Sequence, residues 1–236
     1  IKKLSYIELK NIASRMYLPK SKSKDECIKN IIDAFNEYEN YKKKNIDKYT
    51  RIEQLGLAGK EGIVYKVVTK GKKEYAMKTF KMSKSSKTIK LEAETQNVAA
   101  KCGISPKVIS VDTVDNNIVM ELLDKTLLET IINKNGKITK VVQEAIIDII
   151  CELDKCGIFH ADPNPLNFMF DKNGKLYIID FGYAKHIDQK LKKKLNTSYP
   201  NRVYMLPGII LKLREIFPDA TYKTLMKPLT ETEKEM

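Results

Sequence analysis

Residues that could do chemistry gather in the stretch GIFHADPNPLNFMF, which spans residues 157–170. It places His160, Asp162 and Asn167 between apolar flanks. Two prolines, Pro163 and Pro165, exclude a regular helix between them. A carboxylate and an amide oxygen suit Mg²⁺, because this ion binds oxygen donors and otherwise keeps water and phosphate oxygens. The stretch therefore predicts a rigid loop that preorganises Asp162 and Asn167 for a metal-dependent reaction.

A second carboxylate follows a predicted hairpin. Short strands are expected at residues 168–170 and 176–179, joined by the turn DKNG, and Asp180 comes directly after the second strand. A hairpin of this kind would bring Asp162, Asn167 and Asp180 around one point. Such an arrangement serves phosphoryl transfer, in which Asn167 and Asp180 hold the metal while Asp162 orients or deprotonates the attacking group.

A glycine-rich segment, LGLAGKEGIVY at residues 55–65, lies between two predicted strands. Its glycines, Gly56, Gly59 and Gly62, would let backbone N–H groups approach phosphates. The segment is not a Walker A loop, because Glu61 stands where Ser or Thr would hold Mg²⁺. It predicts a phosphate-covering turn of another kind.

Lys78 stands inside the apolar strand YAMKTF, residues 75–80. A cationic group on a strand that faces a cleft needs an anionic partner, and either a nucleotide phosphate or a helix glutamate could supply it. On the helix expected at residues 83–102, Glu94 lies on the apolar stripe that we expect to face inward. We therefore predict Glu94 as the partner of Lys78, with Glu92 as its rival.

The remaining elements indicate two lobes with a cleft between them. Two further strands are expected near residues 108–114 and 118–122, followed by the clearest amphipathic helix, at residues 138–156. We therefore expect an α+β fold with a strand-rich lobe at residues 46–123 and a truncated helical lobe at residues 124–236.

From about residue 51 to residue 185, the chain resembles the protein-kinase-like fold. A glycine loop, a strand lysine, a helix glutamate, a hinge (residues 120–123), an HxD…N loop and a DFG sequence occur in that order. More narrowly, GKEGIVY and HADPNPLN look like the corresponding segments of RIO-type atypical kinases, while HADPNP is also similar to UbiB-type kinase-like proteins.

This resemblance implies that ATP binds between the lobes, with Mg²⁺ at Asn167 and Asp180. Lys78 would hold the α- and β-phosphates, Glu94 would orient Lys78, and Asp162 would align the acceptor hydroxyl. His160 would brace the loop through its ring. The residues implied at the nucleotide are Gly56, Gly59, Gly62, Val64, Ala76, Lys78, Glu121 and Leu123.

The chain departs from conventional protein kinases at three points. Ala161 replaces the arginine of the HRD loop, a change that disfavours control by activation-loop phosphorylation. Asn164 stands where conventional kinases carry a lysine that contacts the γ-phosphate, so transfer would be slow or would use another cation. No APE motif follows Gly182, which favours a minimal lobe of the RIO-like kind over the usual peptide-binding platform.

The segment before the kinase-like region, residues 1–45, predicts two short helices joined by a loop. Pro19 ends the first helix, and Ser23 with Glu26 gives the second a capping-box start. The segment looks like a SAP-type helix-extended-loop-helix motif, a family associated with DNA binding, with lysines in its loop. A plain docking or packing hairpin is an equal alternative.

Composition sets further bounds. Forty-three Lys and Arg residues against 30 Asp and Glu leave a net charge of +13, which favours polyanionic partners or, equally, a lysine-rich solvated surface. Four cysteines form no CxxC pair, and two histidines are too few for a zinc site, so we expect reduced thiols in an intracellular protein, cytoplasmic, nuclear or packaged in a virion. No apolar run approaches the roughly 20 residues that span a bilayer.

The sequence therefore predicts a minimal RIO-like Ser/Thr protein kinase that transfers the γ-phosphoryl group of ATP with Mg²⁺ to a protein substrate. An ATPase switch on a large assembly is the nearest alternative. A second alternative is a nucleotide-binding scaffold associated with DNA or nucleoprotein, which the SAP-like segment and the positive charge favour. A small-molecule kinase is the weakest, because few residues are left for a helical acceptor domain.

Overall fold

The computed structural model describes residues 1–16, 18–45 and 48–232. The chain divides into two compact units, one comprising Ile1–Thr50 with Val68–Lys73 and the other comprising Arg51–Val67 with Glu74–Met236. The predicted domain boundary after residue 45 falls at residues 46–47, outside the described residues. Within the described part of the chain, no helix combines the length and the apolar character of a membrane span.

The N-terminal unit contains a pair of helices, α1 (Tyr6–Arg15) and α2 (Lys24–Asn45). Ser5 and Glu8 form a capping box at the start of α1. At the start of α2, the Ser23 hydroxyl accepts the Glu26 N–H (3.1 Å). The helices pack through a small buried cluster: Leu9, Ala13, Cys27 and Ile31.

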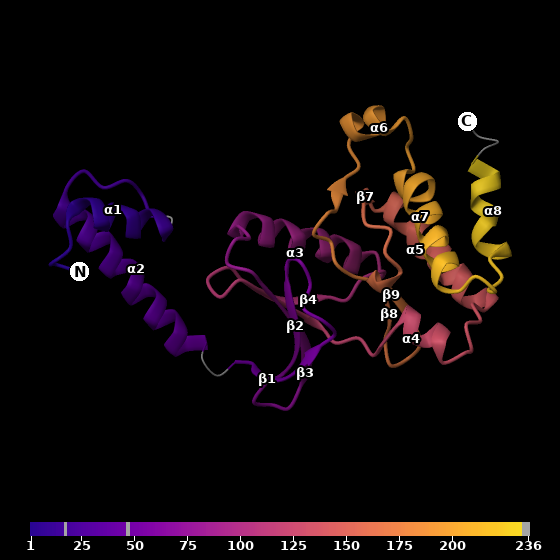
Figure 1. Cartoon of the computed structure of the whole chain (residues 1–236), viewed down its shortest axis with the longest axis horizontal. Helices are drawn as coiled ribbons and strands as arrows, with labels where there is room; N and C mark the ends of the chain where they lie inside the picture. Colours follow the sequence, from indigo (N-terminus) through magenta and orange to yellow (C-terminus); the bar gives the residue numbers. More distant parts are fainter. Residues whose placement is uncertain (17, 46–47, 233–236) are drawn as a thin grey trace. The chain divides into compact units, whose positions relative to one another are not determined.

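The second unit is built around a five-stranded sheet whose strands run in the order β1-β2-β3-β5-β4. The strands are β1 (Thr50–Leu55), β2 (Gly62–Val68), β3 (Glu74–Phe80), β4 (Val108–Asp112) and β5 (Asn117–Glu121). Helix α3 (Ser86–Lys101) packs against β4 and β5 (Figure 1). The sheet and helix enclose the first core: Ala76, Phe80, Ile89, Ala93, Ile118 and Met120.

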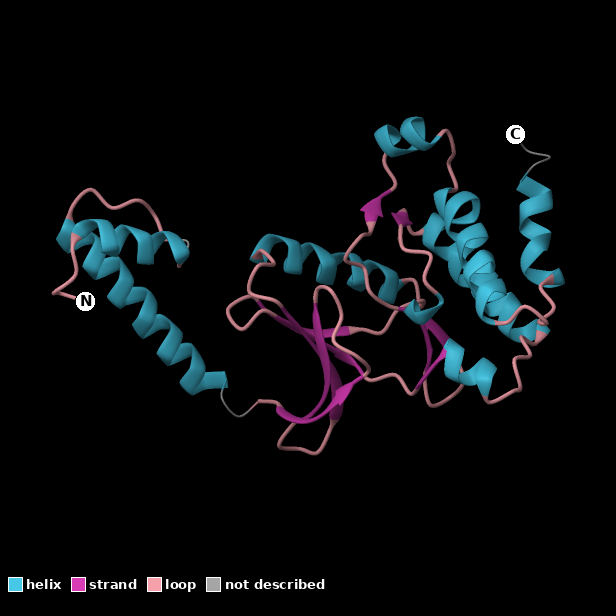
Figure 2. Ribbon diagram, viewed as in Figure 1, coloured by secondary structure: helices cyan, strands magenta, loops and turns pink. Residues whose placement is uncertain are grey.

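The rest of this unit is mainly helical. Its helices are α4 (Leu127–Ile132), α5 (Lys140–Lys155), α6 (Gln189–Leu195), α7 (Leu206–Ile216) and α8 (Lys223–Thr232), with short helical turns η1 (Pro165–Asn167) and η2 (Asn201–Met205). Its strands are β6 (Lys125–Thr126), β8 (Phe168–Phe170) and β9 (Leu176–Ile178) in one sheet, with β7 (Ile158–Phe159) and β10 (Lys185–His186) in another. Helix α8 lies against both α5 and α7 (Figure 2), over a large apolar core that includes Ile146, Ile150 and Leu153.

The predicted α+β fold, with a strand-rich lobe followed by a helical lobe, is confirmed. The amphipathic helix expected at residues 138–156 is α5, and the hairpin expected before Asp180 is β8–β9. The boundary proposed between residues 123 and 124 stays a prediction.

The inward face of α3 differs from the predicted one. Leu91 and Val98, which lie on the stripe expected to face inward, are 56% and 43% exposed. Gln96 instead lies on the buried face, where it is tolerated because its side chain donates to the Pro106 carbonyl (3.0 Å). Large apolar side chains on the opposite face made the sequence pattern misleading. The buried face contains smaller and polar residues: Ile89, Glu92, Ala93, Gln96 and Ala99.

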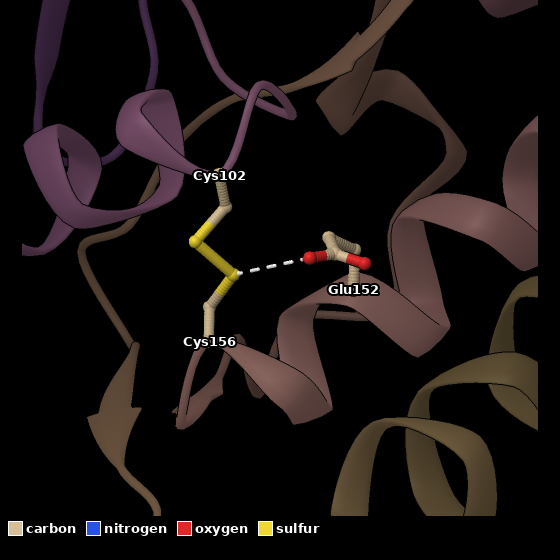
Figure 3. A group of neighbouring side chains, drawn as sticks. All are labelled: Cys102, Glu152 and Cys156. Carbon is tan, nitrogen blue, oxygen red and sulfur yellow. Dashed lines mark hydrogen bonds between the residues drawn. A yellow bond between two sulfur atoms is a disulfide. The ribbon is translucent and has the colours of Figure 1, made fainter.

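The expectation of four reduced thiols is wrong for two of them. Cys102 and Cys156 form a disulfide (Figure 3), whereas Cys27 and Cys151 are free. Each bonded cysteine is the C-cap of a helix, α3 or α5, and each is followed by a glycine with positive φ. Sequence spacing could not reveal that these two helix ends meet.

We predict that reduction of the Cys102–Cys156 bond destabilises the protein. The bond joins residues separated by 54 positions, and opening such a loop should lower the free energy of unfolding by about 2–4 kcal/mol. Urea unfolding with and without dithiothreitol measures this loss. The double variant Cys102→Ser, Cys156→Ser should not respond to the reductant, whereas Cys151→Ser should respond like the unmodified protein. A reductant that leaves the unfolding midpoint of the unmodified protein unchanged would contradict the prediction.

Candidate active site

An ion-pair network joins the two lobes at Lys78. Lys78 lies on β3, and its Nζ is 2.7 Å from Glu92 Oε1 on α3 and 2.7 Å from Asp180 Oδ1 after β9. The Lys78 and Glu92 side chains are only 11% and 3% exposed. Strand, helix and hairpin therefore each supply one member of a charged cluster whose lysine and glutamate are largely shielded from water.

The prediction that Glu94 pairs with Lys78 is wrong, and its rival Glu92 takes that position. Glu94 is exposed and borders a surface groove together with Leu91 and Val98. Glu92 lies on the buried face of α3, next to Ala93. Two positions correspond to more than half a turn of a helix with about 3.6 residues per turn, so the two carboxylates point in different directions.

The two charges at the centre of the network stabilise each other. Burial by itself would lower the pKa of Lys78, but the negative charges of Asp180 and Glu92 outweigh it and hold the pKa above its ordinary value. For Asp180, burial by itself would raise the pKa, but the Lys78 ammonium and the Gly182 N–H outweigh it and hold the pKa below its ordinary value. Lys78 and Asp180 are therefore both ionised at neutral pH.

The loop between β7 and β8 brings Asp162 and Asn167 into contact. Asn167 Nδ2 donates to Asp162 Oδ2 (2.9 Å), and the Asn167 N–H donates to the Asn164 carbonyl (2.9 Å). Asn164, which stands in place of the conventional lysine, caps the turn η1, because its side-chain oxygen accepts the Leu166 N–H (3.1 Å). The Asn164 side chain thus holds the loop conformation.

Asn167 and Asp180 leave the same end of one hairpin. Phe168 pairs with Ile178, and the Ile179 N–H donates to the Asn167 carbonyl (2.9 Å). The Asn167 side-chain nitrogen is directed to Asp162, so the side-chain oxygen is the atom left for a cation. Together with the Asp180 carboxylate, whose side chain is 42% exposed, this donor set fits the oxygen preference of Mg²⁺.

His160 braces this loop from the interior, as the resemblance implied. It is fully buried, its ring Nε2–H donates to the Ile179 carbonyl (3.0 Å), and its ring packs edge-on against Phe181. Burial lowers the pKa of His160, so the ring is neutral at pH 7. Ala161 and Asp180 have φ of 64° and 66°, a left-handed conformation that the surrounding packing must enforce.

Asn201 supports the loop from a distant part of the chain that no motif in the sequence marks. It is fully buried, and its side-chain nitrogen donates to Asp154 Oδ1 (2.7 Å) and to the Ile158 carbonyl (2.7 Å). Its side-chain oxygen accepts the His160 N–H (3.0 Å). Asn201 thus joins α5, β7 and the start of the loop. No local pattern marks a single asparagine so far along the chain from its partners.

The glycine-rich segment forms the turn between β1 and β2. The Gly59 N–H donates to the Gly62 carbonyl (2.8 Å), which closes the turn. Gly56 has a left-handed φ of 68°. A Cβ on Gly62 would overlap the Thr79 carbonyl oxygen of β3. Backbone conformation therefore favours glycine at position 56, and close packing against β3 requires glycine at position 62. The contact of these glycines with a nucleotide stays a prediction.

The other residues implied at the nucleotide belong to the same sheet or follow it. Ala76 is buried and pairs with Met120 of β5, while Val64 packs partly buried against the same cluster. The Glu121 carboxylate accepts the Lys107 N–H (2.9 Å), and Leu123 is half-buried shortly after β5. Their role at a nucleotide also stays a prediction.

Fold and site together define a two-lobed protein of the kinase type. A strand lysine is bridged to a helix carboxylate and to the aspartate of a DFG sequence, and the HxD…N loop runs into the hairpin that carries this aspartate. Residues 49–221 match the protein kinase domain, and the chain belongs to this family.

Several curated proteins are similar to this chain. A probable serine/threonine-protein kinase, PknB of Lactococcus lactis, is 25% identical over 68% of this chain and 27% of its own length. Cyclin-dependent kinase 11.1 of Caenorhabditis elegans is 28% identical over 64% of this chain and 23% of its own. The mitosis inhibitor protein kinase SWE1 of Saccharomyces cerevisiae is 27% identical over 75% of this chain and 23% of its own. The chain thus spans about a quarter of the length of these relatives.

We predict that Glu92 and Glu94 differ sharply in their effect on stability. Glu92→Gln removes a buried charge that accepts from two lysines, and should lower the free energy of unfolding by about 1–3 kcal/mol. The matched variant Glu94→Gln changes an exposed side chain and should alter the free energy of unfolding by no more than about 0.5 kcal/mol. Urea unfolding monitored by circular dichroism measures both. Equal losses would refute the assignment of Glu92 to the buried network.

Proposed function

We propose that this chain is a Ser/Thr protein kinase that uses ATP and Mg²⁺. The observation that carries the proposal is the bridge from Lys78 to both Glu92 and Asp180, each at 2.7 Å. This bridge positions a buried ammonium group beside the DFG aspartate, as phosphoryl transfer from a nucleotide requires. The names of the relatives PknB and SWE1 support a protein substrate, and that of PknB supports a Ser or Thr acceptor.

Each side chain then has a defined part in the reaction. Lys78 would contact the α- and β-phosphates, and Asn167 and Asp180 would hold Mg²⁺, which would neutralise charge on the phosphates. Asp162 accepts the proton of the acceptor hydroxyl while that oxygen forms its bond to the γ-phosphorus and the bond to ADP breaks. Asn167 Nδ2, 2.9 Å from Asp162 Oδ2, holds that carboxylate in its orientation.

We further propose that the kinase is of the minimal RIO-like type. The segments GKEGIVY and HADPNPLN support this proposal, together with Ala161 and Asn164 at positions where conventional kinases carry basic residues. ATP hydrolysis without a protein acceptor is the rival activity within the same type. Both use the same residues at the phosphates, so the two differ in whether a hydroxyl or water accepts the phosphoryl group.

Asp162→Ala should abolish phosphoryl transfer while nucleotide affinity is kept. The Asp162 carboxylate acts on the acceptor, so its loss should lower kcat by about 10²–10⁴-fold. Labelled ATP with Mg²⁺ and a panel of protein acceptors gives the rate, and fluorescent nucleotide titration gives the affinity. The exposed residue Asp148 on α5 provides the control variant Asp148→Ala.

Several outcomes would decide between the candidates. Equal transfer by Asp162→Ala and the unmodified protein would refute the mechanism. Release of phosphate with no labelled acceptor would favour the ATPase. Nucleotide binding with neither product would favour a scaffold that only binds nucleotide.

We also propose that the N-terminal helical unit is a SAP-like module that binds DNA. Its two helices pack through a core of their own, and Lys20, Lys22 and Lys24 are exposed in and beside the loop that joins them. Exposed lysines near one helix end would contact phosphates of the DNA backbone and release counterions.

The triple variant Lys20→Ser, Lys22→Ser, Lys24→Ser should bind duplex DNA more weakly. If each lysine contacts one phosphate, the slope of log K against log salt should become shallower by about 2–3 units. Fluorescence anisotropy at several salt concentrations measures this slope. A matched variant removes equal charge from exposed positions of α6 and should keep the original slope: Lys190→Ser, Lys193→Ser, Lys194→Ser. DNA binding that survives deletion of residues 1–45 would contradict the assignment of this segment as a SAP-like DNA-binding module.

A further inference from the structure

A second lysine lies in the candidate active site, at a position that no motif in the sequence marks. Lys84 comes from the segment between β3 and α3, and its side chain is only 10% exposed. Its Nζ is 2.7 Å from Glu92 Oε2 and 2.6 Å from Glu61 Oε2. Burial of a charged lysine is costly unless it is paired, so these two carboxylates are what keep Lys84 in the site.

Lys84 and Lys78 share the groups that hold them. Glu92 binds Lys78 through Oε1 and Lys84 through Oε2, so one buried carboxylate positions both ammonium groups. The Phe80 ring contacts both, with the Nζ atoms of Lys78 and Lys84 5.0 Å and 4.5 Å from its centroid. Lys84 is therefore held in part by the same carboxylate and the same ring as Lys78.

A carboxylate of the glycine-rich turn contacts both lysines. Glu61 Oε2 is 2.6 Å from Lys84 Nζ and 3.9 Å from Lys78 Nζ. The same oxygen lies beside the DFG segment, 2.6 Å from where a Cβ on Gly182 would be. The Glu61 side chain is 29% exposed, so part of it already faces solvent.

The cluster has one carboxylate more than it has ammonium groups. Oxygens of Glu61, Glu92 and Asp180 all lie within 4.8 Å of one another, and the two lysines are bonded among them. Glu92 is committed to both lysines, and Asp180 is positioned for a metal. If Glu61 leaves, each lysine still has a carboxylate partner, because Lys84 would keep Glu92 at 2.7 Å and Lys78 would keep Glu92 and Asp180, each at 2.7 Å.

We propose that Lys84 is a second phosphate-binding lysine and that Glu61 is a built-in competitor, which the phosphates of the nucleotide displace. This inference rests on the proposed function, because it assigns the same site to a nucleotide polyphosphate. A phosphate oxygen has the negative charge and acceptor geometry of the carboxylate oxygen that it replaces. Lys84 thereby supplies the cation that is missing from the loop between β7 and β8. In that loop Asn164 stands where conventional kinases carry a lysine, and its side chain caps η1.

The proposal predicts that variants at these positions change the affinity for ATP, which carries phosphates, and not the affinity for adenosine, which carries none. Lys84→Met should weaken binding of ATP by about tenfold or more, since a charge-assisted contact is lost, and should leave binding of adenosine unchanged. Glu61→Gln should have the opposite effect and raise the affinity for ATP several-fold, while the affinity for adenosine stays unchanged. Isothermal titration of the full chain with ATP and with adenosine measures both.

Control variants keep the test independent of folding. Lys87→Met removes an exposed lysine from the start of α3 and should change neither affinity. Lys84→Arg keeps the charge and should retain most of the ATP affinity. If Lys84→Met loses adenosine binding as well, it is misfolded, and Glu61→Gln alone then decides the proposal.

Results that contradict the inference about Lys84 and Glu61 can be told apart from results that contradict the proposed kinase function. ATP affinity unchanged by Lys84→Met, or ATP bound no more tightly by Glu61→Gln, overturns the inference even if Asp162→Ala abolishes transfer. ATP binding that depends on both residues supports the inference even if no acceptor is phosphorylated. A chain that binds no ATP overturns both proposals.

Discussion

The structure depends on a buried ammonium group, that of Lys78, which must find its counter-charges on two separate elements. An ion in the interior loses its hydration, and only well-placed partners compensate for that loss. Here Glu92 and Asp180 do so at 2.7 Å each. Because one carboxylate comes from α3 and the other from the end of β9, the network is complete only when sheet, helix and hairpin are in register.

The loop that carries Asp162 is made rigid by hydrogen bonds from two buried side chains, those of His160 and Asn201. His160 contacts the backbone before Asp180, and Asn201 contacts the backbone of His160 and the buried carboxylate of Asp154. Buried polar groups with well-placed partners fix one conformation, because a rearrangement would leave donors or acceptors unpaired. This network supports the positive φ at Ala161 and at Asp180, the positions that set the directions of the two aspartates.

A covalent bond reinforces the same geometry. Helix α3 carries Glu92 and ends at Cys102, whereas α5 ends at Cys156 and leads directly into β7 and the loop. Their disulfide ties the helix that supplies the lysine's partner to the segment that supplies Asp162. Two interactions of different chemistry, an ion-pair bridge and a disulfide, therefore link the strand-rich part to the helical part.

The sequence by itself determined the α+β fold and the loop that carries Asp162 and Asn167, because prolines, turn residues and helical periodicity are local signals that each predict their own element. Only the tertiary structure decided which face of α3 is buried, and hence that Glu92 rather than Glu94 meets Lys78. It also decided the contacts of five residues that no local pattern marks: Cys102, Cys156, Asn201, Lys84 and Glu61. All of these depend on contacts between separate elements, as Lys78 and Asp180 do across 102 positions, and periodicity within one element carries no information about such contacts.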